Sequence, residues 1–417
     1  MNGRASGSDP IALLTPAPLR DDAAIRSESI AQRERQLGGD PGDQITPRIL
    51  AGEYLQRYRE RGDIGDVLRA EAMARRSLRL QPRGNPAALR ALAAAQLTLH
   101  RFRDALAAIR RARRSLPADP GLATFEASVD LELGHVDAAR TLLARFGAGT
   151  TPESETIAAR LDELTGNLAE GRRLLERAGR RADARYDLPA ERRAWFHVRL
   201  GEMAFAAGDV DEALHQEQIA LARFPGDVQA WTDLARFHAA IGAWSRAEDA
   251  ARHAVTLVPS PENLGLLADA QTERGDTGGA AQTRDLILAV ERLGNSQHIV
   301  DRLLAMEEAD HGVRLEDAYR IARRELALRD DLYTEDTLAW CAARSGRWDI
   351  ARTAIAQATR WGTEDARLWY HAGVIAEHDG ARARAREDYE RALRLNPRFQ
   401  ARLADDARAR LAALSRS

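Results

Sequence analysis

The sequence predicts an all-α fold, a right-handed solenoid built from antiparallel helix pairs. The main observation is an internal repeat, in which small residues and a closing proline return at a spacing of about 34 residues, as they do in helix–turn–helix arrays. The repeat is clearest in the middle of the chain, where Leu200, Gly208, Ala213, Ala220 and Pro225 recur as Leu234, Gly242, Ala247, Ala254 and Pro259. Near the end of the chain, Gly346, Ala351 and Ala358 recur as Gly380, Ala385 and Ala392.

Composition supports the same fold class. Hydrophobic residues make up 44% of the 417 residues and charged residues 30%. Alanine, leucine, arginine and glutamate dominate, and all four favour helices. No run of alternating β-branched residues predicts a strand. A globular chain of this length would form about three domains of about 150 residues each, but stacked repeats extend one continuous core instead.

The N-terminal part is expected to be less regular than the rest. Residues 1–20 are rich in Gly, Ser and Pro and predict a disordered tail. Residues 21–85 predict atypical helices that cap the array, with Leu50, Tyr54 and Tyr58 at helical spacing. From Pro86 the register becomes regular, and residues 86–178 predict repeats that each bury one face against the next.

Beyond residue 178 the pattern is interrupted twice. Residues 179–193 are charged and lack apolar periodicity, so they predict an irregular connection, either a loop or an extended helix end. Residues 194–294 return to clear repeats, 295–331 form a degenerate one held in register by Ala318 and Ala322, and 332–397 restore the pattern. Residues 398–417 predict a C-terminal capping helix.

The repeated residue types match what two crossing helices require. Small side chains let helix axes approach to about 8–10 Å, which is the expected role of Ala213, Ala247, Ala351 and Ala385. Gly201 and Gly373 are expected to do the same on the first helix of their units. Glycine after a helix can adopt the left-handed conformation that caps the last carbonyls, as expected for Gly208, Gly242, Gly346 and Gly380. Pro225, Pro259 and Pro397 then end the second helices.

These residues resemble the tetratricopeptide repeat over roughly residues 45–397. Two runs carry the resemblance most strongly: Trp231, Leu234, Ala235, His238, Gly242, Ala247, Ala251, Ala254 and Pro259, and then Trp369, Gly373, Gly380, Ala385, Tyr389, Ala392 and Pro397. Shorter runs, such as Asp336-Thr-Leu-Ala-Trp340, look like a widespread group of bacterial tetratricopeptide proteins. The resemblance implies a superhelix whose concave groove binds a peptide, a helix or a whole protein.

The first helix of each unit would line that groove, so helical periodicity selects the candidate contacts. Aromatic and arginine side chains are the usual anchors of protein interfaces. Because Trp195, Trp340 and Trp369 could instead belong to the core between repeats, that alternative stays open. The predicted partner-binding residues are Trp195, Glu202, Phe205, Arg236, Asp269, Tyr333, Asp336, Trp340, Arg344, Arg367 and Tyr370.

No pattern for catalysis, a cofactor or a metal site stands out. The ten histidines are scattered, and the sequence has no His-Glu-x-x-His run, phosphate-binding loop or Gly-x-Ser-x-Gly elbow. His371 and His378 share a helix face but lack a third good ligand. His371 is instead expected to pair with Asp336 of the preceding unit. The single cysteine, Cys341, excludes a disulfide framework.

The sequence therefore predicts a non-enzymatic scaffold or adaptor that holds a protein or peptide in its concave groove. The alternatives are a peptide-responsive regulator and an accessory subunit of an enzyme complex. A net charge of −2 gives no global attraction to nucleic acid or to an acidic membrane. Without a stretch of about 20 apolar residues or a signal sequence, a cytoplasmic location is expected.

Overall fold

A computed structural model describes residues 22–147, 149, 151–185, 187–296 and 302–416. The predicted tail at residues 1–20 lies outside this range. Within the described residues the chain is all helix, with no strand. The helices are α1 (Asp22–Gly39), α2 (Thr46–Arg61), α3 (Ile64–Leu80), α4 (Pro86–Thr98), α5 (Phe102–Ser115), α6 (Pro120–Glu132), α7 (Val136–Phe146), α8 (Pro152–Leu164), α9 (Leu168–Asp183), α10 (Ala190–Ala206), α11 (Val210–Arg223), α12 (Val228–Ala240), α13 (Trp244–Leu257), α14 (Pro261–Glu273), α15 (Thr277–Ser296), α16 (Arg302–His311), α17 (Leu315–Leu328), α18 (Leu332–Arg344), α19 (Trp348–Ala358), α20 (Ala366–His378), α21 (Arg382–Leu395) and α22 (Ala401–Arg416).

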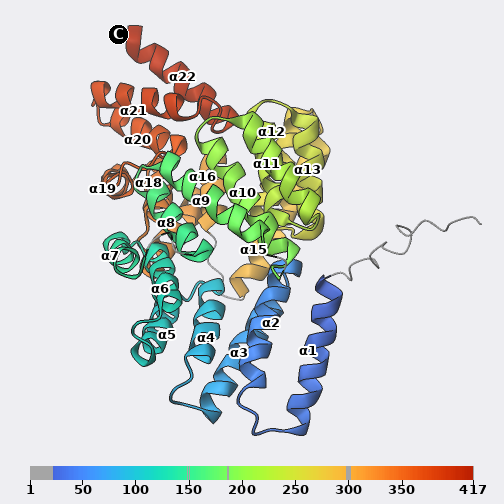
Figure 1. Ribbon diagram of the computed structural model, residues 1–417. Helices are drawn as coiled ribbons and strands as arrows, with labels where there is room; N and C mark the ends of the chain where they lie inside the picture. Colours follow the sequence, from blue (N-terminus) through green and yellow to red (C-terminus); the bar gives the residue numbers. More distant parts are fainter. Residues whose placement is uncertain (1–21, 148, 150, 186, 297–301, 417) are drawn as a thin grey trace, which may run out of the picture.

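Successive helices pair into hairpins, each made of an even-numbered first helix and an odd-numbered second helix, from α2–α3 to α20–α21. The hairpins stack in chain order into an α-solenoid (Figure 1). The sequence specifies this locally. Asp119, Asp227 and Ser260 precede first helices and accept hydrogen bonds from the backbone N–H three residues on, which satisfies donors that a helix N-terminus leaves unpaired.

The predicted roles of the repeated small residues are confirmed. Ala213, Ala247, Ala351 and Ala385 are all buried. Gly208, Gly242, Gly346 and Gly380 follow first helices with φ between 73° and 81°, the left-handed region that glycine tolerates best. A Cβ on Gly373 would lie 2.6 Å from the ring of Tyr389, so the two helices of that unit cross where only glycine fits.

Two second helices extend beyond the regular repeat pattern. Helix α9 continues to Asp183, inside the predicted connection at 179–193, and α10 begins at Ala190. Charged residues of α9 can extend it because they face solvent and do not need an apolar partner. Helix α15 is also long, running to Ser296, because proline does not follow it as it follows α11 and α13.

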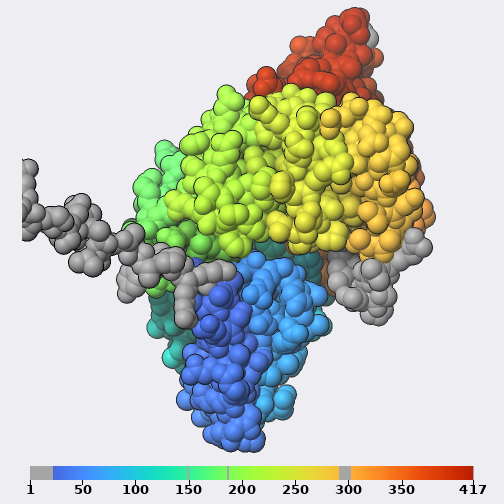
Figure 2. Space-filling view, turned by 90° about the vertical axis from the view of Figure 1, so that its right-hand side faces the viewer, coloured from blue at the N-terminus to red at the C-terminus, as the bar shows by residue number. Residues whose placement is uncertain are grey.

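The solenoid closes on itself, which the repeat pattern did not predict. A Cβ on Gly62 would lie 3.3 Å from Val258, one on Gly134 2.7 Å from the carbonyl oxygen of Asp330, and one on Gly166 2.6 Å from that of Gly362. The members of each pair are 196 residues apart. The turn between the helices of one unit therefore meets a loop between two later units, one superhelical turn further on. Figure 2 shows this stacking, with the N-terminal helices (blue) directly against the middle of the chain (yellow).

We call this line of contacts the seam. Three side-chain hydrogen bonds or ion pairs cross it, with partners 191 to 199 residues apart. The guanidinium groups of Arg140 and Arg329 also lie over the rings of Trp361 and Phe102 across the seam. The hydroxyl of Thr363 donates to the carbonyl oxygen of Leu164 at 2.6 Å, and the amide of Asn396 donates to that of Phe205 at the same distance. Both carbonyls end first helices, where the backbone has no intrahelical donor. The third contact is the ion pair between Arg329 and Glu132, at 3.0 Å.

The apolar core is continuous at the ends of the chain and divided in the middle. One cluster joins α6–α10 to α16–α22 across the seam, and a second holds α1–α6 together. Between them, many of the buried apolar residues of α10–α14 that lie outside the large cluster form three small clusters, linked to one another only through the partly buried Leu214 and Leu221. The middle of the superhelix is therefore its least continuously packed part.

A charged ladder on the first helices

Paired charges on the first helices form the candidate site. Within one helix, Arg160 pairs with Glu163 (2.7 Å), Arg199 with Glu202, and Asp233 with Arg236 (2.9 Å), each three residues apart. Side chains three residues apart share one face of a helix. Between helices, Arg199 reaches Glu163 at 2.8 Å and Arg236 reaches Glu262. Ionic contacts of alternating sign thus link α8 to α10 and α12 to α14, and the amide of Gln229 on α12 donates to Glu202 of α10 at 3.4 Å.

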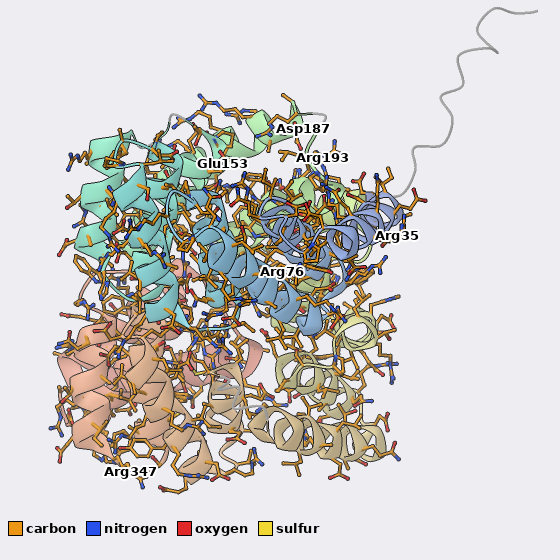
Figure 3. All side chains as sticks on the ribbon, turned by 90° about the horizontal axis from the view of Figure 1, so that it is seen from below. Arg35, Arg76, Glu153, Asp187, Arg193 and Arg347 are labelled. Atoms are coloured by element: carbon orange, nitrogen blue, oxygen red, sulfur yellow. The ribbon has the colours of Figure 1, made fainter. Side chains whose placement is uncertain are left out.

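The same face continues on α14, α16 and α20. Asp269 accepts a hydrogen bond from Nε2 of His311 at 2.9 Å, and Asp310 pairs with Arg367 at 2.6 Å. We call the whole set the charged ladder. Its members are Arg160, Glu163, Arg199, Glu202, Asp233, Arg236, Glu262, Asp269, Glu307, Asp310, His311 and Arg367, all on even-numbered helices from α8 to α20. Seen from below, side chains fill the space between the helices, while Arg35 and Arg347 lie at the outer edges (Figure 3).

Most ladder side chains keep some contact with water. The side chains of Arg199, Glu202 and Arg236 are 23%, 21% and 36% exposed, whereas Asp233 is fully buried. Burial opposes ionisation of Glu163, but the guanidinium groups of Arg160 and Arg199 outweigh it and hold the pKa of that carboxyl below its ordinary value. The ladder therefore presents fixed, mutually paired charges of both signs.

The predicted partner-binding residues separate into two groups. Phe205, Asp336, Trp340 and Tyr370 are between 2% and 8% exposed, so their side chains have almost no free surface. They pack between repeats because a first helix at this crossing turns part of its inner face towards the next unit. Arg344 is exposed, and the other six (Trp195, Glu202, Arg236, Asp269, Tyr333 and Arg367) are half-buried.

Asp336, Trp340 and Tyr370 of the buried group lie together in α18 and α20, whereas Phe205 of α10 stacks on Phe237 with ring centroids 4.3 Å apart. Asp336 accepts a hydrogen bond from Nδ1 of His371 at 2.8 Å, which confirms the predicted pairing. The ring of His371 stacks on Trp340 with centroids 4.2 Å apart, and Tyr370 bonds to Asp406 at 2.7 Å. For Trp340 the core alternative is therefore the correct one, and the tryptophan serves packing between units.

The half-buried group mostly belongs to the ladder or touches it. Glu202, Arg236, Asp269 and Arg367 are ladder members. Tyr333 lies between the guanidinium groups of Arg160 and Arg302, at 5.5 and 5.9 Å from its ring centroid. The exposed Arg344 donates to the carbonyl oxygen of Ala309 at 2.9 Å. Trp195 packs instead beside Phe196 against the large core cluster.

Sequence reasoning missed several ladder members, among them Arg160, Glu163, Arg199, Glu262 and Glu307. For Arg160, Glu163 and Arg199 the signal was present as opposite charges three residues apart on first helices, whereas Glu262 and Glu307 have no opposite charge at that spacing. Choosing candidate residues by their aromatic side chains does not identify such charged pairs.

Asp269, Glu307 and His311 each place one possible ligand atom within 4.8 Å of the others. They come from two helices, so their spacing in the sequence gives no sign of it. Arg402 also contacts Asp269, at 3.3 Å, and Nδ1 of His311 contacts the backbone oxygen of Glu307 at 2.9 Å. Ion pairs and hydrogen bonds account for this arrangement, and we assign no metal to it.

His311 should make the stability of the α14–α16 contact depend on pH. The hydrogen bond to Asp269 raises the pKa of His311 from 6.5 to about 9, despite the opposing effect of burial. A raised pKa stabilises the fold fully below pH 6.5, and the stabilisation disappears as the pH rises through 9. Urea unfolding should therefore show His311→Gln less stable than wild type at pH 6 but not at pH 10. His215→Gln, on an exposed part of α11, serves as the control; a pH-independent loss for His311→Gln would contradict the prediction.

Comparison with known proteins agrees with this architecture. The tetratricopeptide repeat family model matches residues 198–262 and 337–398. No curated protein matches the chain. Among the described residues, no helix has both the length and the apolar content needed to cross a membrane.

Several solved structures are similar in fold. PilW, described as a widely conserved type IV pilus biogenesis factor, is 19% identical, with 50% of this chain and 94% of that chain covered and a TM-score of 0.41. A tetratricopeptide repeat protein from Parabacteroides merdae is 19% identical, with 63% and 98% covered and a TM-score of 0.34. The human IFIT1 dimer with PPP-AAAA is 16% identical, with 89% of each chain covered and a TM-score of 0.48. These similarities say nothing about what this chain binds. The chain therefore contains tetratricopeptide repeats in the two matched segments, and stacked helix pairs continue on both sides of them.

Proposed function

We propose that this protein is a non-enzymatic scaffold that binds a protein partner through the charged ladder. Tetratricopeptide repeat proteins generally bind protein partners and are generally non-catalytic. The observation that supports this surface is the row of half-exposed ionic side chains on consecutive first helices. A cytoplasmic location remains a prediction from the sequence.

The chemistry of the ladder favours one kind of partner. Its aromatic neighbours Trp340 and Tyr370 are buried, so a partner cannot use them as anchors. An arginine that is already paired with one carboxylate can bind a second carboxylate, because its guanidinium group has five N–H donors in a planar fork. The partner we propose is therefore a polar segment with charges of both signs, which exchanges ion pairs with the ladder.

A double variant with two isosteric changes tests this proposal. Glu202→Gln with Glu262→Gln removes two ladder charges and keeps the shape of both side chains. Full-length tagged protein carrying these changes should recover at least tenfold less native partner in affinity purification with quantitative mass spectrometry, because the loss of even one ionic hydrogen bond costs about 1.5–3 kcal/mol.

The matched control is Glu176→Gln with Glu390→Gln. These glutamates are 38% and 36% exposed and lie on the second helices α9 and α21, outside the ladder. The control should recover partners as wild type does. Equal recovery by both double variants would reject the ladder as the binding surface.

A further inference from the structure

The seam is weaker than the contacts along the solenoid. Substantial helix–helix packing among the described residues joins helices that are neighbours or next neighbours in chain order. Across the seam, turns and loops meet instead, through close glycine contacts, the side-chain contacts given above and one part of the large apolar cluster. Few contacts between rigid bodies mark the place where a structure opens at least cost.

Packing at the seam is also incomplete. A cleft of about 410 Å³ that is open to solvent lies there, lined on one side by α5 and the turn after α6 and on the other by α17, with Leu106, Leu133, Leu326 and the exposed Leu328 among its apolar walls. A second cavity of about 20 Å³ separates Leu131 and Leu164 from Leu332 and Trp361. The indole N–H of Trp361 is buried there without a hydrogen-bond partner in the described structure. Unfilled space and an unpaired donor both reduce the free energy that is gained when the two turns come together at the seam.

If the seam opens, the superhelix must flex elsewhere along its length. The segment α10–α14 links the two turns and contains the three small core clusters. It also holds two fully buried carboxyl groups, Glu217 and Asp233. Both oxygens of Glu217 lack hydrogen-bond partners among the described atoms. This segment is therefore the natural hinge, since hinge and shear motions need a region that can repack at low cost.

Opening at the seam would also change access to the charged ladder. Arg160 of the first turn faces the ring of Tyr333 in the second turn at 5.5 Å. Arg402 of α22 reaches Asp269 and Glu273 of α14 at 3.3 and 3.4 Å. These contacts join distant units through side chains of the ladder or beside it, and they persist only while the two turns stay together.

We propose that the superhelix opens and closes. The two turns separate at the seam by bending at the hinge α10–α14, and a partner reaches the charged ladder in the open form. The inference rests on the proposed function for its second half only. The opening itself is a property of the chain alone, and it can be measured without any partner.

Spin labels on opposite turns measure the opening. Asp137 on α7 and Asp349 on α19 have side chains that are 78% and 95% exposed, so Asp137→Cys and Asp349→Cys provide labelling sites. The native Cys341 is fully buried, which protects it from labelling. Electron paramagnetic resonance on the full chain should give a main short distance and a minor longer one.

Removing the seam donors should favour the open form. Thr363→Val with Asn396→Ala deletes the two buried hydrogen bonds across the seam, and the ratio of long to short distances should rise about thirtyfold, because each bond contributes roughly 1 kcal/mol. The control is Thr359→Val, whose hydroxyl bonds within its own helix to Ile355 at 2.8 Å. The same distance distribution in the seam variant and the control would overturn the proposed opening at the seam.

A second measurement tests access to the ladder. With Glu262→Cys as the target, a small maleimide should react at similar rates in all variants, whereas a 5-kDa polyethylene glycol maleimide should react about thirtyfold faster in the seam variant. Equal rates for the large reagent would overturn gated access. A failed partner purification, in contrast, would reject the proposed function and leave both of these results unaffected.

Discussion

Replacing Glu217 with glutamine is expected to stabilise the fold by about 3 kcal/mol at pH 7. Glu217 is fully buried on α11, against Gly201 of α10, and neither carboxylate oxygen has a hydrogen-bond partner in the described structure. In the last unit, Tyr389 takes the same position against Gly373 and bonds to Glu377. The chain thus places an unpaired acid where a related unit places a satisfied aromatic.

The expected gain depends on pH in a defined direction. Burial, with the neighbouring Asp233, raises the pKa of Glu217 from 4.5 to about 11. Folding therefore takes up a proton above pH 4.5, and the stability of the wild type falls as the pH rises towards 11. At pH 7 the cost corresponds to 2.5 pKa units, about 3 kcal/mol. Near pH 4 the acid and the amide should be nearly equal.

Urea denaturation followed by circular dichroism at pH 4, 7 and 8.5 checks this prediction. Glu212→Gln on the same helix, at a side chain that is 31% exposed, should change the unfolding free energy by less than about 0.5 kcal/mol. If Glu217→Gln were neutral or destabilising at pH 8.5, Glu217 would have a partner that the structure does not show. The segment α10–α14 would then be a poorer candidate for a hinge.

The second large effect is expected at Gly166 in the seam. Gly166 has φ of 75°, and a Cβ there would lie 2.6 Å from the carbonyl oxygen of Gly362. Gly166→Ala therefore carries two costs, about 1–2 kcal/mol for a left-handed alanine and about 1–3 kcal/mol for forcing the two turns apart. The total loss of unfolding free energy should be roughly 2–5 kcal/mol.

Gly242 provides a matched control for this substitution. It has φ of 73° and nothing within 4 Å of a built Cβ, so Gly242→Ala should lose only the first of the two costs. Urea unfolding compares the two variants directly. Equal losses would mean that the turns already sit further apart in solution and that the glycine contact contributes nothing to the seam.

The sequence by itself determined the local architecture. The 34-residue spacing gave the helix pairs, because alanine at a crossing, glycine after a first helix and proline after a second each have a local steric reason. It also gave the Asp336–His371 pair, since one repeat length brings those positions together on stacked helices. All of these features depend on a residue and its neighbours within one unit or the next.

The tertiary structure decided which candidate residues are available to a partner. Trp340 and Tyr370 lie on first helices, as periodicity indicates, but the angle between stacked units turns them into the core. The same angle leaves the charged side chains of Arg199, Glu202 and Arg236 partly exposed. Periodicity predicts which face of a helix a residue lies on, whereas the burial of that face depends on how far the next unit is rotated relative to the helix.

Closure of the seam was decided only at the level of the whole chain. Gly166 meets Gly362 after 196 residues because small rotations between units add up to one superhelical turn. No local pattern marks that distance, since Gly166 and Gly242 are both left-handed glycines after a first helix and only one of them is covered. The sequence determines each step of the superhelix, and the sum of those steps determines which surfaces meet.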